Sequence, residues 1–375
     1  MIVRNFLKLP LKSSFNPEEL KKNRTMTQNP SRPELEEFYQ RIDGHELAPL
    51  WEVIHKLLAR QPITRAVPHL WRYREVRPFL MESGEIISAK EAERRVLILE
   101  NPNLRGEAKT ADSLYAGLQL ILPGEIAPAH RHTQSALRFI VEGEGAYTAV
   151  DGERAYMNPG DLILTPSWSW HDHGHKGSDP MVWLDGLDIP QVQFFGSTFG
   201  EGYDADVFET TLPPGTNQAR FGANVRAVDD LPEKHFSPLF TYPFNETNQA
   251  LEKLIQSREP NPWHGYKMEY QNPMNGGPVM PTLSAFLHGM QKKFISRPYQ
   301  TTEHQVFSVI RGSGTTMVGE GKDQIEISWQ PKDHFVIPGW YRYTHQAEAD
   351  STLFSFSDQG SQQKLGIWRE KKHEI

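Results

Sequence analysis

The strongest constraint on the fold of this chain is an internal repeat of short, turn-bounded apolar runs. Residues 139–145 (FIVEGEG) have a counterpart at 307–314 (FSVIRGSG), and residues 159–166 (PGDLILTP) have one at 331–338 (PKDHFVIP). A repeat of this kind indicates one structural unit that occurs twice. Alternating apolar and polar residues between glycine turns are typical of an antiparallel sandwich or barrel. The sequence therefore predicts an all-β protein with two related domains.

The N-terminal region has a helical pattern instead. Ser31 can cap a helix with Pro33 in its first turn, and a second helix is expected from about Pro49 until Pro62. We expect these helices to pack on a domain or on a neighbouring subunit. The predicted division, in chain order, is an N-terminal arm with helices (1–90), a first β domain (91–200), an irregular inter-domain region (201–280) and a second β domain (281–375).

Composition excludes several classes of function. Forty Lys and Arg against 47 Asp and Glu give a net charge of −7, which does not favour binding to nucleic acid or to anionic membranes. The chain has no cysteine, so its candidate metal ligands are His, Asp and Glu. It has no run of about eighteen apolar residues, and residues 1–10 lack the pattern of a signal peptide. We therefore expect a cytoplasmic protein.

Three histidines of the first β domain stand at metal-ligand spacing. His130 and His132 are two residues apart, so in a strand their side chains share one face. His171 follows a turn at Gly160 and can lie across from them on a later strand. Three neutral imidazoles can hold a divalent metal and leave positions open, although nitrogen ligands alone do not choose between Fe(II), Zn and others.

These residues resemble the paired motifs of the cupin family, which are glycine, five residues and His-x-His, then glycine, five residues, proline and a histidine. The matching residues are Gly124, His130 and His132 in the first motif, and Gly160, Pro166 and His171 in the second. The usual cupin glutamate is absent, since Ala136 and Leu137 stand where it is expected. The expected ligand set is therefore three histidines alone.

Longer strings around the histidines resemble the gentisate 1,2-dioxygenase family. They are residues 128–139 (PAHRHTQSALRF), 164–174 (LTPSWSWHDHG) and 183–188 (WLDGLD), and the resemblance extends from about residue 90 to the end. It implies a bicupin, in which the double-stranded β-helix occurs twice, preceded by N-terminal helices. It also implies one Fe(II) per chain in the first cupin, cytoplasmic aromatic degradation and a homotetramer.

Arginines near the ligands are the candidates for binding a substrate carboxylate. Arg138 lies within an apolar strand, and a guanidinium can bind a carboxylate through two hydrogen bonds. The resemblance favours Arg94 as a second contact, whereas we expect its neighbour Arg95 to be exposed. In the strand at 114–122, the leucines occupy one face; if that face packs outward, Tyr115, Gly117 and Gln119 line the lumen.

His173 and Asp185 are the candidate catalytic residues. His173 shares strand parity with His171 and could be a fourth ligand, a base, a partner of a ligand or a structural residue. Three histidine ligands already leave the vacant coordination positions that oxygen chemistry needs, so we favour a role as a base for His173. Asp185 could orient His173 or a bound hydroxyl. Trp168 and Trp170 are expected to pack around the site.

The second β domain is predicted to lack metal. Tyr299, Thr301 and Tyr343 replace the three ligand histidines, and only the scattered His304 and His345 remain.

The resulting hypothesis is an Fe(II)-dependent extradiol-type dioxygenase that converts gentisate and O2 to maleylpyruvate. One alternative is the same chemistry on salicylate or 1-hydroxy-2-naphthoate, the substrates of relatives in the same group. Two further alternatives are a metal-dependent cupin isomerase or hydrolase, which needs no oxygen, and a non-catalytic bicupin of storage or sensor type.

Overall fold

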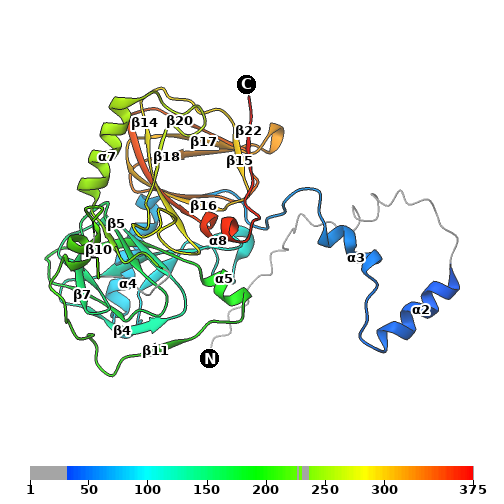
Figure 1. Cartoon of the computed structure of the whole chain (residues 1–375), viewed down its shortest axis with the longest axis horizontal. Coiled ribbons are helices and arrows are strands. Elements are labelled where there is room, and N and C mark those ends of the chain that lie inside the picture. Colours follow the sequence, from blue (N-terminus) through cyan, green and yellow to red (C-terminus); the bar gives the residue numbers. More distant parts are fainter. Residues whose placement is uncertain (1–31, 226–227, 230–235, 375) are drawn as a thin grey trace, which may run out of the picture. The chain divides into compact units, whose positions relative to one another are not determined.

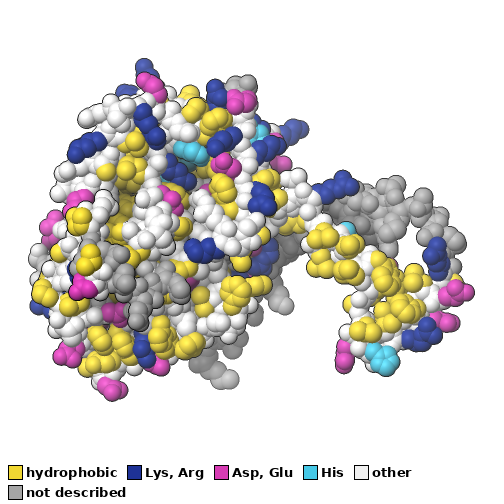
Figure 2. Space-filling view, viewed as in Figure 1, with side chains coloured by type: hydrophobic (Ala, Val, Ile, Leu, Met, Phe, Trp, Pro, Cys, Tyr) yellow, Lys and Arg dark blue, Asp and Glu magenta, His cyan; other side chains and the backbone are white. Residues whose placement is uncertain are grey.

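The computed structural model describes residues 32–225, 228–229 and 236–374, and the chain divides into two compact units, Met1–Gln61 and Pro62–Ile375. In the first unit, α2 (Pro33–Asp43) and α3 (Leu50–Leu57) form as predicted, although α3 ends well before Pro62. The proposed cap, Ser31, lies outside the described residues. Apolar side chains of these helices are exposed, including Trp51 at 58% and Leu57 at 66% (Figure 2).

The first barrel of the second unit consists of two antiparallel sheets (Figure 1). Its strands are β2 (Val96–Ile98), β3 (Tyr115–Ile121), β4 (Ile126–His132), β5 (Ala136–Glu142), β6 (Ala146–Val150), β7 (Glu153–Tyr156), β8 (Leu162–Thr165), β9 (His171–His175), β10 (Met181–Leu187), β11 (Gly200–Gly202) and β12 (Thr241–Tyr242). One sheet has the order β12-β8-β5-β10-β3-β2 and the other β11-β4-β9-β6-β7. The predicted all-β fold is confirmed for this domain.

The second barrel repeats this arrangement. Its strands are β1 (His69–Trp71), β13 (Tyr266–Glu269), β14 (Ser284–Met290), β15 (Tyr299–Thr301), β16 (Gln305–Arg311), β17 (Gly314–Val318), β18 (Ile325–Trp329), β19 (His334–Ile337), β20 (Tyr343–Ala347), β21 (Ser351–Ser357) and β22 (Glu370–Lys372). The orders are β1-β19-β16-β21-β14-β13 and β18-β17-β20-β15-β22. Strand β1 precedes the first barrel in sequence but pairs with β19 of the second.

Helices cover parts of both barrels. They are α4 (Tyr73–Ile86), α5 (Ile189–Phe194), α6 (Thr216–Phe221), α7 (Phe244–Ser257) and α8 (Gln359–Lys364). Helix α4 packs on the leucine face of β3, where Leu120 and Leu122 approach Gly84, as the strand pattern predicted. Among the described residues, no helix combines the length and the hydropathy needed to cross a membrane.

The segment 201–280 is not irregular throughout, and the prediction is wrong for β11, α6, β12, α7 and β13. These elements are short or bury few side chains of their own; Leu251 is the only buried residue of α7. Strands β11 and β12 complete sheets of the first barrel by pairing with β4 and β8. Their formation depends on partner strands elsewhere in the chain, which local periodicity does not reveal.

The two barrels share one apolar core. The rings of Phe139 and Phe354 stack with centroids 4.2 Å apart, and a side chain at Gly186 would collide with Phe356. The outer faces of the two six-stranded sheets therefore pack against each other, and the interior of each barrel is left to a separate set of side chains.

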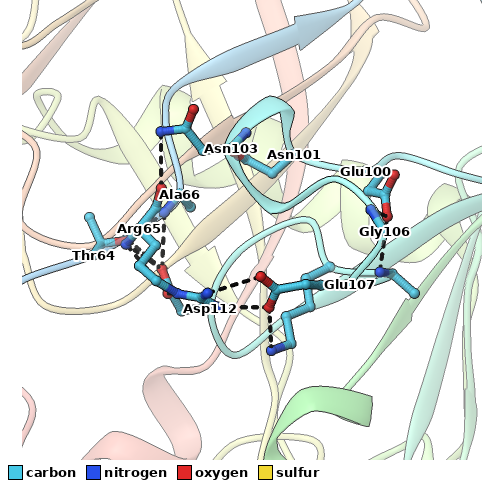
Figure 3. A network of polar contacts seen from close by, with 11 residues as sticks. Thr64, Arg65, Ala66, Glu100, Asn101, Asn103, Gly106, Glu107 and Asp112 are labelled. Atoms are coloured by element: carbon cyan, nitrogen blue, oxygen red, sulfur yellow. Dashed lines mark hydrogen bonds and ion pairs between the residues drawn. The ribbon is translucent and has the colours of Figure 1, made fainter. Parts of the chain in front are cut away.

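A polar network fastens the start of this unit to the loop before β3 (Figure 3). Arg65 donates two hydrogen bonds to the Glu107 carboxylate at 2.7 and 2.9 Å, and the backbone N–H groups of Arg65 and Ala66 donate to Asp112. Arg65 and Lys109 lower the pKa of Glu107 to about 2. Because solvent reaches both side chains, 56% exposed in Arg65 and 36% in Glu107, these ion pairs contribute little to stability and mainly orient the segment.

Candidate metal centre

The structure brings the three predicted histidines together. His130 on β4 lies directly opposite His171 on β9, with an irregular register just before it. Their Nε2 atoms are 2.9 Å apart, and nitrogen atoms of His130, His132 and His171 all lie within 4.8 Å of one another. One divalent cation can therefore contact all three imidazoles.

Backbone carbonyls orient two of these rings. The Nδ1 of His132 lies 2.8 Å from the Gln134 carbonyl oxygen, and that of His171 lies 3.0 Å from the Ser169 carbonyl. A carbonyl only accepts, so each Nδ1 carries the proton and each Nε2 keeps its lone pair for a metal. The third ring, His130, receives a contact at 3.0 Å from the Arg94 guanidinium.

Burial keeps the trio neutral. Burial, followed by the nearby Arg94, lowers the pKa of His130 to about 2, and burial lowers the pKa of His132 to about 4. The pKa of His171 also lies well below its ordinary value, chiefly because of burial. Neutral imidazole is the form that binds metal, so the site is ready for a cation at physiological pH.

The buried Arg138, the partly buried Arg94 and the buried Asp185 lie next to the trio. Arg138 is 3% exposed, with its Nε 3.5 Å from the Asp185 carboxylate and one Nη donating to the Thr165 hydroxyl. Burial and then Arg138 lower the pKa of Arg94 to about 9, so Arg94 stays protonated at neutral pH. The two guanidiniums provide N–H donors that can bind an anionic ligand.

Arg95 corrects one prediction. We expected its side chain to be exposed, but it is 3% exposed and pairs with Glu125 at 2.5 Å, while also donating to the Ile87 carbonyl. Two adjacent arginines on an extended segment point to opposite sides, and here tertiary packing covers both sides.

His173 is buried beside the trio with one nitrogen free. Its Nδ1 lies 2.9 Å from the Thr148 hydroxyl, whereas its Nε2 has no hydrogen-bond partner among the described residues. Burial lowers its pKa well below the ordinary value. Sequence reasoning missed Thr148, although it lies directly opposite His173 in the β6–β9 pairing.

Asp185 is not bonded to His173, contrary to one predicted role. Its side chain pairs with Arg138 and accepts a hydrogen bond at 3.0 Å from the Trp183 indole. Burial raises its pKa to about 6 against the lowering effect of Arg138. The Trp183 ring lies between it and His173, 5.3 Å from the imidazole centroid. Asp185 therefore positions Arg138.

The predicted lumen face of β3 is confirmed by strand register. Gly117 lies opposite Asp185 and Gln119 lies opposite Trp183, while Tyr115 stands two residues before Gly117 on the same face. A side chain at Gly117 would approach Val96 to 2.4 Å and the Tyr115 hydroxyl to 3.2 Å. Glycine here makes room for the Val96 side chain, which occupies the place of a Cβ atom.

The tryptophans that flank the third ligand have a defined partner. The Arg131 guanidinium lies 4.4 Å from the Trp168 ring centroid and 4.6 Å from that of Trp170. This stack stiffens the outer side of β4 between the ligands His130 and His132. A cavity of about 550 Å³ opens along the same strand and is bounded by β11.

Comparison with known proteins places these features in context. Residues 117–187 match the cupin domain model. The chain is 50% identical to gentisate 1,2-dioxygenase 1 of Aquipseudomonas alcaligenes over 91% of this chain and 97% of that protein. It is 35% identical to 5-aminosalicylate 1,2-dioxygenase of Comamonas sp over 91% of both chains. The crystal structure of salicylate 1,2-dioxygenase from Pseudoaminobacter salicylatoxidans with gentisate superposes with a TM-score of 0.85 at 32% identity, covering 93% of this chain and 97% of that one.

Proposed function

The chain belongs to the gentisate 1,2-dioxygenase family of cupin ring-cleaving dioxygenases, and we propose that it converts gentisate and O2 to maleylpyruvate with one Fe(II) in its first barrel. In this reaction the ring bond between the carboxyl-bearing and the neighbouring hydroxyl-bearing carbon breaks. Both atoms of O2 enter the product, so no further reductant is needed.

The donor set of the trio fits iron. Three neutral imidazoles from two adjacent strands would hold the cation, and no carboxylate of the described residues belongs to the cluster. Fe(II) bound there supplies the one-electron chemistry that makes the reaction of O2 with an aromatic ring possible. Every other requirement of the reaction falls on side chains of the chain itself.

Arg138 and Arg94 are the proposed carboxylate contacts. Arg94 reaches His130 at 3.0 Å, so a carboxylate held by it lies next to the metal position. Asp185 holds Arg138 from the side, which fixes the direction of its remaining donors. Tyr115 flanks the ring and Gln119 donates to a substrate oxygen in this arrangement, since both belong to the lumen face of β3.

His173 is the proposed base. In the tautomer that donates from Nδ1 to the Thr148 hydroxyl, the Nε2, which has no partner among the described residues, accepts a proton from the substrate hydroxyl para to the first. Loss of that proton increases the electron density of the ring and favours its reaction with oxygen.

One observation carries the proposal: a neutral histidine trio lies beside the Arg94 and Arg138 guanidiniums. The experiment is anaerobic reconstitution with Fe(II), followed by oxygen uptake with gentisate, salicylate and 1-hydroxy-2-naphthoate. We expect gentisate to be the best substrate, one mole of O2 to be consumed per mole of gentisate, and Zn to give no activity.

Related acids remain the second candidate, because relatives named for 5-aminosalicylate and 1-hydroxy-2-naphthoate are 35% and 33% identical to this chain. Preference for either acid in the same panel would select that substrate. Turnover without oxygen, or with zinc alone, would instead select a cupin isomerase or hydrolase.

We further propose a homotetramer in the cytoplasm, with the second barrel free of metal. The resemblance to the family supports the assembly and the location. The replacement of the ligands by Tyr299, Thr301 and Tyr343 supports the second-barrel proposal. Sedimentation velocity and iron analysis of the purified protein test the assembly and the metal content.

A further inference from the structure

Helices α5 and α8 are equivalent elements of the two barrels. Asp188 immediately precedes α5 and accepts a hydrogen bond at 2.5 Å from Thr282, which leads into the second barrel. Asp358 immediately precedes α8 and accepts one at 2.6 Å from Ser113, which leads into the first. The Ser113 carbonyl also accepts from Gln191 of α5 at 3.3 Å. The two helices therefore lie side by side and are related by an approximate two-fold exchange of contacts (Figure 1).

The chain that ends each helix exposes apolar side chains. The α5 loop (194–199) and the α8 loop (364–369) together form the α5–α8 patch, whose apolar residues are Phe194, Phe195, Phe199, Leu365 and Ile367. Each is more than half exposed, and Phe194 is 84% exposed. Together they expose on the order of 600 Å², and each partner of a standard interface buries about 800 Å². The patch therefore supplies most of the area that a stable dimer needs.

The α5 loop is held in a fixed conformation. Thr133 donates its backbone N–H to the Phe199 carbonyl at 3.1 Å and its hydroxyl to the Ser197 carbonyl at 2.8 Å. The Phe199 ring packs on Trp168 with centroids 4.6 Å apart, and the Trp168 N–H donates to the His132 carbonyl at 2.8 Å. A surface held in this way binds a partner without the cost of ordering a loop first.

The two loops have complementary chemistry. Residues 189–200 contain three phenylalanines and no charged residue, whereas residues 359–369 contain Lys364 and Arg369 and no carboxylate. Aromatic side chains without charged neighbours are typical of the core of an interface. Cationic side chains bind favourably over aromatic rings. Contact between the α5 loop of one copy and the α8 loop of another therefore joins rings with cations, and it keeps the two cationic loops apart.

We propose that the α5–α8 patch binds a second copy of this chain, with the α5 loop of each copy on the α8 loop of its partner. This inference rests on the homo-oligomer proposed above and names the surface through which two copies meet. The contact uses the same patch on both copies, so it closes on itself, and two such pairs can assemble into a tetramer.

Sedimentation velocity of the full-length, iron-loaded protein and of two single variants tests the proposal. Phe195→Asp and Leu365→Lys each place an unpaired charge in the contact twice per pair of copies. Each variant should therefore halve the sedimenting mass and raise the dissociation constant about a hundredfold. Circular dichroism should show that both variants remain folded, because both side chains are exposed in the single chain.

The matched control is Phe79→Asp. Phe79 lies on α4, outside the patch, and is 65% exposed, against 66% for Phe195. The control variant should keep the sedimenting mass of the unmutated protein.

A mixture of the Phe195→Asp and Leu365→Lys proteins separates contact between copies from a local effect. In a mixed pair, the introduced carboxylate meets the introduced ammonium at one contact, and the other contact is unmutated. Mixing should therefore restore the larger mass. No restoration on mixing, or equal dissociation of Phe79→Asp, would overturn the proposal.

The unmutated protein separates this inference from the assembly on which it rests. A monomer at micromolar concentration would contradict both the homo-oligomer and the interface. An assembled protein whose mass is insensitive to Phe195→Asp and Leu365→Lys would contradict the interface alone. Binding to phosphatidylglycerol vesicles that Phe195→Asp abolishes, with assembly unchanged, would assign the patch to a lipid surface instead.

Discussion

The two barrels have the same strand order but opposite interiors. His130 opposite His171 in the first barrel corresponds to Tyr299 opposite Tyr343 in the second. The second lumen is an apolar cluster that includes Phe307, Trp329 and Phe335, all of them 1% exposed or less. The first lumen instead holds the Arg138–Asp185 ion pair and the buried His171 and His173. One topology therefore serves as a stable scaffold where its interior is packed, and as a reactive site where packing is given up.

Strand register extends the comparison residue by residue. Arg138 pairs with Asp185 in the first barrel, and Phe307 pairs with Ser355 at the same place in the second. Gly117 lies opposite Asp185, whereas Phe286 lies opposite Ser355. An ion pair next to a glycine is thus replaced by two aromatic rings, which fill the space that a substrate needs.

One feature is common to both interiors. His173 contacts Thr148 at 2.9 Å, and His345 contacts Thr316 at 2.8 Å. In the second barrel the Trp329 indole also donates to that threonine. The histidine–threonine bond therefore belongs to the repeated fold, and what distinguishes His173 is its free Nε2 beside the ligand trio.

The largest effect is expected at a ligand. His132→Ala removes one of three imidazoles, so iron and turnover should both be lost, with activity reduced by more than about a thousandfold. Iron analysis and oxygen uptake check this result. Retained iron-dependent activity would refute the ligand set.

Packing of the second lumen should dominate stability. Phe307→Ala removes a buried ring stacked on Phe335 with centroids 4.7 Å apart, and it should cost about 3–5 kcal/mol of unfolding free energy. Iron stoichiometry of the folded variant should be unchanged. Urea denaturation with parallel iron analysis measures both, and a loss of iron without loss of stability would show that the two interiors are not independent.

Asp185 should impose a pH dependence of its own on the stability of the chain. Its pKa is raised from 3.8 to about 6, so the folded state binds the proton more tightly and this residue lowers stability as pH rises from 4 to 6. A shift of this size corresponds to about 3 kcal/mol. In urea denaturation, the unfolding free energy of Asp185→Asn, measured relative to that of the unmutated chain, should therefore increase from pH 4 to pH 7. A difference that does not vary with pH would contradict the raised pKa.

Removal of the carboxylate contact should have a smaller effect on turnover. Arg138→Ala should raise KM for gentisate about 10- to 100-fold while iron content stays near that of the unmutated chain, because Arg138 binds substrate and not metal. Arg138→Lys is the matched control and should recover part of the loss. Unchanged kinetics of the alanine variant would remove Arg138 from the substrate site.

The smallest effect is expected for His345→Ala. This residue is the second-barrel counterpart of His173, and its replacement should leave iron stoichiometry and KM unchanged. Iron analysis provides the test. A fall of the bound iron to half would show that the second barrel holds metal.

Local patterns were sufficient for much of this molecule. The alternation of apolar and polar residues predicted the strands, and the glycine turns marked where each strand ends. Because side chains in a strand alternate between its two faces, the two-residue spacing of His130 and His132 placed both on one face. The lumen face of β3 was predicted by the same reasoning, from the position of its leucines.

Other features required the pairing of distant strands. The sequence repeat aligned Phe139 with Phe307, but strand register places Arg138 at the position of Phe307, a slip of one residue that reverses the face. The burial of Arg95 and the attachment of Asp185 to Arg138 also came from neighbouring segments.

The sequence by itself determined the repeat, the strand class and the residues of the histidine trio, because each depends on a short-range period along the chain. Tertiary structure decided which lumen is packed and which is open, where each arginine points and which carboxylate holds it. These depend on register between strands that are far apart in sequence, and a shift of one residue there exchanges the interior for the exterior.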